Sequence, residues 1–318
     1  MEYLLLVIGF ALLVKGADYF VEGSSDIAKL LRIPPILIGL TVVAFGTSSP
    51  EAAVSISAAL KGSGNIALGN VIGSNIFNAS LIIGVTAMIY PLKVERQTIR
   101  KEIPLALLSS IVLLVMMADI SLQNLRENLV TRSDGLILIG FFSIFLYYIF
   151  EVATHNRENT NSDNTILDKK DISKSVLYTI GGLAAIIFGG DMVVKNSIRI
   201  ALTLGMSETL VGLTIVAVGT SLPELITSIT AAFKKESEIA LGNIVGSNIF
   251  NILFILGISS TISPVLVDSK MFLDAIVMIA VTLILLLSSS SNGKVSKAEG
   301  LFLVLSYVIY TIYIIIRN

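Results

Sequence analysis

The sequence predicts an all-α integral membrane protein with ten transmembrane helices, arranged as two inverted-topology five-helix repeats. Two observations lead to this fold class. Of the 318 residues, 54% are hydrophobic and only 14% are charged, which is far from the balance of an average soluble domain. In addition, the second half of the chain repeats the first half at a constant spacing.

Long apolar windows define the predicted helices. A transmembrane helix needs roughly 20 mostly apolar residues, and such windows fill nearly the whole chain between short polar joints. The windows are continuous, whereas the strands of a membrane β-barrel alternate over about ten residues, so a barrel is excluded. The first window lacks the basic segment and the cleavage site of a signal peptide, and we expect it to be a helix. The predicted helices span residues 3–22, 36–60, 65–90, 103–119, 134–153, 175–196, 207–233, 238–262, 271–288 and 299–316.

An internal repeat organises these helices. Adding 173 to a residue number in the first half gives its counterpart in the second half, as for Glu51 and Glu224, and this holds without a gap from about residue 9 to residue 78. The predicted units are a first repeat at 1–153 with its motif-bearing core (α-repeat 1) at about 36–90, a polar linker at 154–174, and a second repeat at 175–318 with its core (α-repeat 2) at about 207–262.

The helix count predicts the topology. Five is an odd number, so two repeats with the same fold must enter the membrane from opposite sides, as in many secondary transporters, whose binding sites lie near the midplane at the repeat interface. Lysine and arginine are about twice as frequent in the loops on one side as on the other. The positive-inside rule then predicts a multi-pass cell-membrane protein with both termini outside and the linker in the cytoplasm.

Composition also limits the chemistry. The chain contains no cysteine, and its only histidine, His155, lies in the linker. Disulfides, thiolate metal sites, cysteine nucleophiles and a buried histidine base are therefore excluded. We predict no catalytic residue, no cofactor and no nucleic-acid partner.

Each repeat places a proline and a glutamate inside a membrane helix. The segments are "GTSSPE", which ends at Glu51, and "GTSLPE", which ends at Glu224. Pro50 and Pro223 have no N–H group, so carbonyl oxygens in the preceding turn are freed. In hydrocarbon a freed carbonyl costs several kcal/mol unless protein, water or an ion binds it. A carboxylate there costs roughly 3 kcal/mol and indicates a functional site.

Neutral oxygen ligands accompany these carboxylates. Thr47 lies four residues before Glu51, and Thr220 four before Glu224, so each pair shares a helix face. The next helices contain "GNVIGSNIFN" and "GNIVGSNIFN". Their i, i+4 pairs are Ser74 with Asn78 and Ser247 with Asn251, and their glycine pairs, predicted to let helices approach closely, are Gly69 with Gly73 and Gly242 with Gly246. Such oxygens suit Na⁺ and Ca²⁺, and we expect the groups to converge on one volume.

Two further acidic residues lie in predicted helices 1 and 6. Asp18 stands three residues after Lys15, and Asp191 is its counterpart in the second repeat. Both lie near the ends of their predicted spans. We predict that they anchor the helices at the membrane interface or form local pairs.

The repeated motifs resemble those of a known family. "GTSSPE" with "GNVIGSNIFN", and "GTSLPE" with "GNIVGSNIFN", are similar to the two α-repeats of the cation/calcium antiporter superfamily, in particular its prokaryotic Na⁺/Ca²⁺ exchanger branch. The resemblance covers nearly the whole chain. The proton-coupled branch has a different motif at the glutamate, which favours Na⁺ as the counter-ion.

The resemblance implies a set of ligands. It implies that Glu51 and Glu224 bind Ca²⁺ together with the backbone carbonyls of Thr47 and Thr220. The implied Na⁺ ligands are the same glutamates, the carbonyls of Ala44 and Ala217, and the side chains of Ser48, Ser221, Ser74, Ser247 and Asn78. Some relatives, including potassium-dependent ones, have an aspartate at the position of Asn251. The cluster here has two carboxylates rather than three, which weakens a potassium-dependent reading and leaves the number of Na⁺ ions open.

The predicted function is secondary active exchange of Ca²⁺ for Na⁺ by alternating access, with these two ions and the lipid bilayer as partners and the oligomeric state open. One alternative is an H⁺/Ca²⁺ or other cation exchanger on the same fold. An intramembrane hydrolase, which would use a buried carboxylate pair for acid–base chemistry, is a distant alternative.

Overall fold

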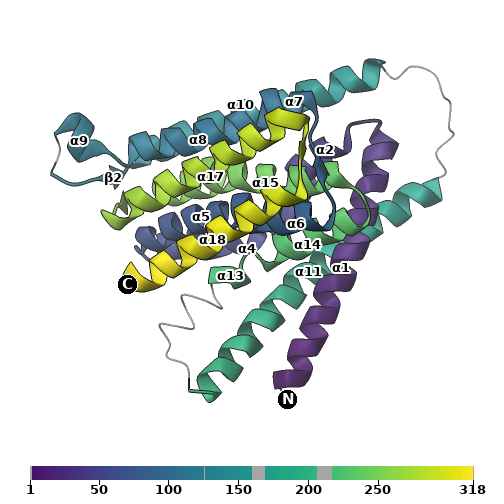
Figure 1. Ribbon diagram of the computed structural model, residues 1–318, viewed down its shortest axis with the longest axis horizontal. Coiled ribbons are helices and arrows are strands. Elements are labelled where there is room, and N and C mark those ends of the chain that lie inside the picture. Colours follow the sequence, from purple (N-terminus) through teal and green to yellow (C-terminus); the bar gives the residue numbers. More distant parts are fainter. Residues whose placement is uncertain (1, 125, 160–168, 206–216, 318) are drawn as a thin grey trace.

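The protein is almost entirely helical (Figure 1). The structure, a computed structural model, describes residues 2–124, 126–159, 169–205 and 217–317. Within these residues, 7 helices are long and apolar enough to cross a membrane, or up to 8 if the bent pair Pro35–Thr47 and Ser49–Leu60 forms one span. The multi-pass, all-α prediction is therefore confirmed.

The elements of the two halves follow each other in a similar order. Before the linker they are α1 (Glu2–Leu31), α2 (Pro35–Ile38), the π-helix η1 (Gly39–Val43), α3 (Ala44–Thr47), α4 (Ser49–Leu60), α5 (Gly64–Phe77), η2 (Asn78–Ile82), α6 (Ile83–Ile89), β1 (Leu92–Lys93), α7 (Arg96–Arg100), α8 (Glu102–Met116), α9 (Asp119–Gln123), β2 (Leu129–Val130) and α10 (Arg132–Asn159). After it they are α11 (Lys169–Thr203), α13 (Ala217–Gly219), α14 (Leu222–Phe233), α15 (Ser237–Phe250), η4 (Asn251–Leu256), α16 (Gly257–Ile262), β3 (Val265–Leu266), α17 (Lys270–Asn292), β4 (Lys294–Val295) and α18 (Lys297–Arg317).

The first helix of each half is longer than its apolar window. α1 runs to Leu31 although the prediction ended at residue 22, and α11 begins at Lys169 and ends at Thr203, beyond the predicted 175–196. Charged residues end the apolar window, but they do not end the helix, because its backbone hydrogen bonds form within the helix whatever the side chains are. Of the span predicted at 207–233, residues 207–216 lie outside the described residues.

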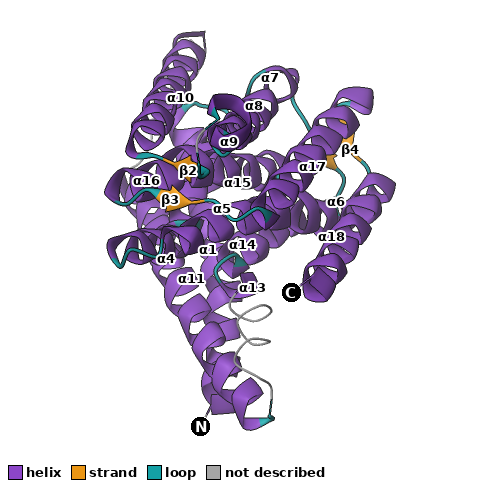
Figure 2. Ribbon diagram, turned by 90° about the vertical axis from the view of Figure 1, so that its left-hand side faces the viewer, coloured by secondary structure: helices purple, strands orange, loops and turns teal. Residues whose placement is uncertain are grey.

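The long helices α1 and α11 pack against each other and project from the rest of the molecule (Figures 1 and 2). Their contact depends on glycines seven residues apart. A Cβ atom on Gly16 would lie 2.9 Å from the carbonyl oxygen of Gly182, and one on Gly189 would lie 2.8 Å from that of Gly9. The backbones of α1 and α11 therefore touch directly.

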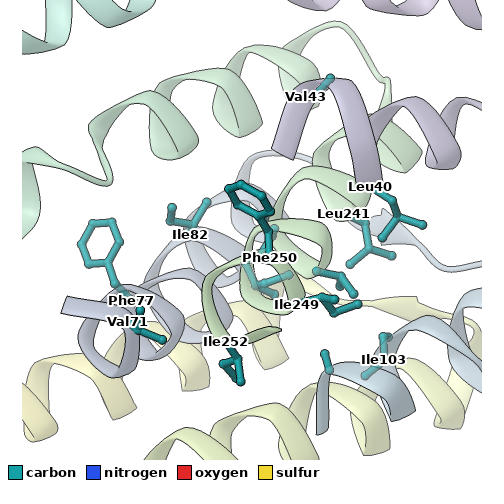
Figure 3. Packing of buried hydrophobic residues seen from close by; sticks show 14 of the residues in the cluster. Leu40, Val43, Val71, Phe77, Ile82, Ile103, Leu241, Ile249, Phe250 and Ile252 are labelled. Atoms are coloured by element: carbon teal, nitrogen blue, oxygen red, sulfur yellow. The ribbon is translucent and has the colours of Figure 1, made fainter. Parts of the chain in front are cut away.

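The segments α5–α6 and α15–α16, which have equivalent places in the two halves, lie at the centre of the molecule. In the most apolar window of Ser237–Ile262, 94% of residues are buried, against 11% in Lys297–Arg317, which places α15 inside and α18 at the periphery. Figure 3 shows Leu241, Ile249 and Phe250 of α15 packed among side chains of η1, α5 and α8. The motif-bearing helices thus form the core of the protein.

Four two-residue strands were not predicted. β1 pairs with β4, with Leu92 opposite Val295, and β2 pairs with β3, with Leu129 opposite Leu266. Each pair joins a loop of the first half to a loop of the second. Strands this short have no period-2 pattern that a sequence could reveal.

The acidic residues of helices 1 and 6 pair differently. Asp191 forms a local ion pair with Lys195 at 2.8 Å, as predicted for this position. Asp18 instead pairs with Lys234 at the end of α14, at 2.7 Å, and not with Lys15. A local partner was predicted because only neighbours in sequence were visible, whereas the real partner is 216 positions away.

Candidate cation-binding site

The proline motif of the first half breaks its helix next to the glutamate. α3 ends at Thr47, Ser48 adopts φ −82° and ψ 8°, and α4 begins at Ser49 with Pro50 in its first turn. The axis bends by 51° at this point. Proline has no N–H group to donate to the carbonyl four residues before it, and its ring clashes with that carbonyl. The break in the helix therefore follows from the sequence. Glu51 lies in the first turn of α4, directly beyond the break.

The second half repeats this arrangement. Ser221, with φ −90° and ψ 8°, separates α13 from α14, and Glu224 lies in the first turn of α14 after Pro223. Glu51 is 1% exposed and Glu224 is fully buried. Both carboxylates therefore stand at equivalent positions in the interior, each at the N-terminal end of a short helix whose free N–H groups favour negative charge.

Each carboxylate is held by a serine from the opposite half. Ser48 Oγ donates to Glu224 Oε1 at 2.7 Å, and Ser221 Oγ donates to Glu51 Oε1 at 2.9 Å. These are charge-assisted hydrogen bonds, which are stronger than neutral ones. The two broken helices are thus fastened crosswise, and the two carboxylates belong to one cluster.

The serines of α5 and α15 complete this cluster. Ser247 Oγ lies 2.9 Å from Ser48 Oγ, and Ser74 Oγ lies 3.3 Å from Ser221 Oγ. A hydroxyl has one proton to donate, and Ser48 and Ser221 give theirs to the carboxylates, so Ser247 and Ser74 act as donors here.

Four asparagines form a hydrogen-bonded frame within about one helical turn of Ser74 and Ser247 along the chain. Asn78 Nδ2 donates to Asn248 Oδ1 at 3.1 Å, and Asn251 Nδ2 donates to Asn75 Oδ1 at 3.0 Å. The amide groups of Asn75 and Asn248 are themselves held by each other's backbone carbonyls. This network fixes the amide orientation of Asn78 and Asn251, because their nitrogen atoms are the ones engaged.

Within the part of the chain that the structure describes, four acceptor oxygens of the cluster have no hydrogen-bond partner. They are Oε2 of Glu51, Oε2 of Glu224, Oδ1 of Asn78 and Oδ1 of Asn251, all of them buried. An unpartnered buried acceptor costs about 1–3 kcal/mol, and more when it is charged. The described residues contain no group of three or more acidic, histidine or cysteine side chains that could hold a metal ion. The donor set is therefore two carboxylates among neutral hard oxygens, which suits Ca²⁺ or Na⁺ rather than a transition metal.

The two threonines of the motifs differ in their environment. Thr47 is fully buried and its hydroxyl lies 2.9 Å from Asn243 Oδ1. Thr220 Oγ1 has no partner among the described residues, and Thr220 lines a cavity of about 610 Å³ together with Ser74. The cavity reaches this side of the cluster from Asn65 at the start of α5 and Met271 at the start of α17. Among the described residues, the Thr220 side of the cluster therefore borders a cavity, whereas the Thr47 side is packed.

The two alanines were predicted for their backbone carbonyls. Ala44 is fully buried at the start of α3, and its carbonyl accepts the N–H of Ser48 at 3.0 Å. The Thr47 hydroxyl also lies 3.4 Å from this oxygen. Ala217 begins α13, next to residues outside the described part of the chain. Of the twelve predicted residues, the structure brings the side chains of Glu51, Glu224, Ser48, Ser221, Ser74, Ser247, Asn78, Asn251, Thr47 and Thr220 into this region.

Comparison with known proteins identifies the family. The family model described as "Sodium/calcium exchanger protein" matches residues 1–151 and 174–316. The chain belongs to the sodium/calcium exchanger family. It falls within the prokaryotic branch of the cation/calcium antiporter superfamily, as the motifs indicated. Because this is a family of ion exchangers, the protein is a transporter and not an enzyme, and the hydrolase alternative is excluded.

Individual relatives span the whole exchanger. The putative antiporter CaxA of Alkalimonas amylolytica is 39% identical, over 96% of this chain and 96% of its own. The sodium/calcium exchanger MaX1 of Methanosarcina acetivorans is 36% identical, over 98% and 97%. A solved structure of the sodium-calcium exchanger NCX_Mj, soaked with Na⁺ and no Ca²⁺, superimposes with a TM-score of 0.85 at 30% identity and covers 97% of each chain.

Four asparagines of the exchanger motifs were not predicted as part of the site. Besides Asn75 and Asn248, they are Asn70 and Asn243. Asn243 Nδ2 donates to the Ser228 hydroxyl at 2.9 Å and lies 3.4 Å from the carbonyl of Glu224, and Asn70 makes the equivalent contacts with Ser55 and Glu51. The sequence spacing could have revealed them. Asn70 and Asn243 stand four residues before the motif serines, and Asn75 and Asn248 stand three residues before the motif asparagines, so each shares a helix face with a predicted site residue.

Of the glycines predicted to let helices approach closely, Gly242 and Gly246 do so, whereas among the described residues a Cβ atom on Gly69 would meet only the Met271 side chain and one on Gly73 nothing within 4 Å. A Cβ atom on Gly242 would lie 2.9 Å from the Cα of Gly39, and one on Gly246 would lie 2.7 Å from the Cα of Leu40. By the offset of 173, the corresponding partner of Gly69 is Gly212, which lies outside the described residues. The contact of α15 with η1 closes the cluster on the side of Thr47.

Proposed function

We propose that this exchanger moves Ca²⁺ against Na⁺, with both ions competing for the site between Glu51 and Glu224. The observation that carries the proposal is the pair of buried carboxylates, one from each half. Each has an oxygen that no described group binds, and so do the buried amides of Asn78 and Asn251 on the adjoining helices. Two carboxylates in the interior are stable only if their charge is compensated. Relatives named as sodium/calcium exchangers support the choice of these two ions.

The charge of the cluster explains competition between the ions. One Ca²⁺ or two Na⁺ would neutralise the two carboxylates. Once either is bound, no negative charge remains to attract the other ion. Thr47, Thr220, Ala44 and Ala217 would add backbone carbonyls, and the motif serines hydroxyl oxygens, to reach the six to eight ligands that Ca²⁺ prefers. Ca²⁺ and Na⁺ are in this account the transported substrates, and no separate cofactor takes part.

We also propose the ten-helix, inverted-repeat architecture, with repeats at 1–153 and 175–318 joined by a cytoplasmic linker at 154–174. The crosswise bonds support it, because Ser48 to Glu224 and Ser221 to Glu51 exchange places under the offset of 173. The asparagine frame has the same two-fold relation. Reciprocal contacts of this kind arise when two equivalent units face each other about a two-fold axis.

Alternating access follows from this symmetry. The cavity opens between the first residues of α5 and α17 and the last turn of α18, where Ile315 lies, and the proposed topology places these helix ends outside. On the opposite side Thr47 is bonded to Asn243 and the backbones of η1 and α15 touch. The described arrangement is then the outward-open one. If the two repeats exchange their conformations, the cluster opens to the inside.

The counter-ion is tested by Ca²⁺ uptake into proteoliposomes loaded with Na⁺, K⁺ or choline at one fixed pH. We expect uptake only with an outward Na⁺ gradient, because Na⁺ prefers the same hard oxygen ligands as Ca²⁺ and two Na⁺ would neutralise the two carboxylates as one Ca²⁺ does. A pH gradient imposed on Na⁺-free vesicles should give no uptake. Uptake driven by that pH gradient would identify a proton-coupled exchanger instead, and uptake with K⁺ alone would reject the assignment of Na⁺.

A further inference from the structure

A lysine fastens the site-bearing helix α14 to the projecting pair α1 and α11. Lys234 Nζ lies 2.7 Å from Asp18 Oδ1 and 3.5 Å from Glu22 Oε2, and it donates to the Asp18 carbonyl at 2.9 Å. Close by, Ser25 Oγ donates to Glu236 at 2.8 Å. The side chain of Lys234 is 28% exposed, so these bonds are partly shielded from solvent. α1 also packs against α14.

The equivalent contact is missing on the other side of the molecule. Under the offset of 173, Lys234 corresponds to Lys61 at the end of α4, and Asp18 corresponds to Asp191 on α11. Lys61 is exposed, and its side chain makes no hydrogen bond or ion pair with any residue that the structure describes. Asp191 pairs with Lys195 of its own helix. Between the described residues, α11 has no packing on α4 comparable with that of α1 on α14.

We propose that Lys234 and Lys61 are alternating latches, which hold the α1–α11 pair against α14 in one access state and against α4 in the other. They are positioning residues, since neither belongs to the ion cluster. This inference rests on the alternating access proposed above. In the described state the Lys234 latch is closed on the side where Thr47 seals the cluster, and the Lys61 latch is open on the side of the cavity.

The geometry supports a movement of the whole pair. α1 and α11 touch through their backbones at Gly16 and Gly182, so they move together rather than separately. If the pair shifts until α11 reaches α4, Asp191 arrives at Lys61 as Asp18 now stands at Lys234. Asp191 then exchanges its exposed intrahelical partner Lys195 for Lys61.

The two latches are unequal in strength. Lys234 faces two carboxylates, of Asp18 and Glu22, whereas the counterpart of Glu22 is Lys195. Lys61 would therefore meet one carboxylate that a second lysine also attracts. Because like charges weaken such a contact, the state with the Lys234 latch closed is favoured.

Crosslinking tests whether both contacts form. The chain has no cysteine, so two cysteines can be introduced on a clean background. A short bis-methanethiosulfonate crosslinker should join the pair Asp18→Cys with Lys234→Cys, and also the pair Lys61→Cys with Asp191→Cys, in proteoliposomes during transport. Each crosslink should stop exchange until a reductant breaks it. The mixed pair Asp18→Cys with Lys61→Cys is the matched control and should not react. Absence of the Lys61–Asp191 crosslink during transport, while the Asp18–Lys234 crosslink forms, would overturn the proposal.

Labelling tests the effect of charge on the population of the two states. Loss of a partly exposed ion pair should lower the ratio of the cavity-open to the cavity-closed state by up to about fivefold. Because the cavity-open state is the favoured one, Val54→Cys, which lines the cavity, should then react with a membrane-impermeant thiol reagent about 1.5- to threefold more slowly when Lys234→Ala is added. Lys234→Arg, or Lys234→Glu combined with Asp18→Lys, should restore the rate. Lys61→Ala should not lower it. Equal labelling in Lys234→Ala and Lys61→Ala would contradict the model. Both readouts report helix positions, so they do not depend on which ion proves to be the counter-ion.

Discussion

Replacing either glutamate by glutamine should abolish exchange. Glu51→Gln or Glu224→Gln keeps the shape of the side chain but removes half of the charge in the cluster, and it converts one acceptor into an amide donor. Unit charges 4 Å apart attract by about 4 kcal/mol at an effective dielectric constant of 20, which is roughly a thousandfold in affinity. We therefore expect the initial rate of Na⁺-driven Ca²⁺ uptake in proteoliposomes to fall by at least about 100-fold in each single variant.

The chain provides a matched control for this loss. Glu102, in the first turn of α8, is also 1% exposed, and it accepts a hydrogen bond from the Tyr148 hydroxyl, away from the cluster. Glu102→Gln should retain uptake within a few-fold of the unmodified exchanger, because glutamine can still accept that bond. If Glu51→Gln and Glu102→Gln lost the same share of activity, the loss would reflect folding and the assignment of the site would fail.

The second large effect is expected at the crossing of η1 and α15. Gly242→Ala would place a methyl group 2.7 Å from the carbonyl oxygen of Ile36 and 2.9 Å from the Cα of Gly39. Both are backbone atoms, so no side chain can move aside. Overpacking of this kind costs typically about 1–3 kcal/mol, and here it separates two motif-bearing elements. We expect a lower midpoint of thermal unfolding in detergent and loss of uptake.

The functional loss has a specific cause. α15 supplies Ser247 and Asn243, which reach Ser48 and Thr47 across this crossing. A displacement of α15 by a fraction of an ångström therefore lengthens both hydrogen bonds. Gly140→Ala on α10 is the matched control, since a Cβ atom there meets nothing within 4 Å. It should leave the unfolding midpoint and uptake unchanged, and a Gly242→Ala variant as stable and active as Gly140→Ala would refute the close crossing.

The sequence was most informative where it repeats. The offset of 173 identified Glu51 and Glu224 as equivalent before any coordinates, and the structure places their serine partners crosswise. A single copy of the motif would have predicted a kinked helix with a buried acid. The duplication predicted one shared cluster, because equivalent groups of two repeats meet at their common interface.

Long-range pairing could not be predicted in the same way. The spacing in sequence predicted a local pair of Asp18 with Lys15, but the ion-pair partner of Asp18 is Lys234, from the other half of the chain. Asn75 and Asn248 were not predicted, because an asparagine in a membrane helix indicates a polar contact but not which residue it contacts. In the structure the side-chain amide of each donates to the backbone carbonyl of the other. The ends of α1 were misplaced since a hydropathy window measures how apolar a segment is, not where its backbone bonds stop.

The central claim is that two glutamates from two repeats form one cation site rather than two. Equilibrium binding of radioactive Ca²⁺ to the purified exchanger in detergent tests it directly. We expect one Ca²⁺ per chain, displaced by Na⁺, and complete loss of binding in either Glu51→Gln or Glu224→Gln alone. Two Ca²⁺ per chain, or half of the binding retained in each single variant, would contradict the shared site.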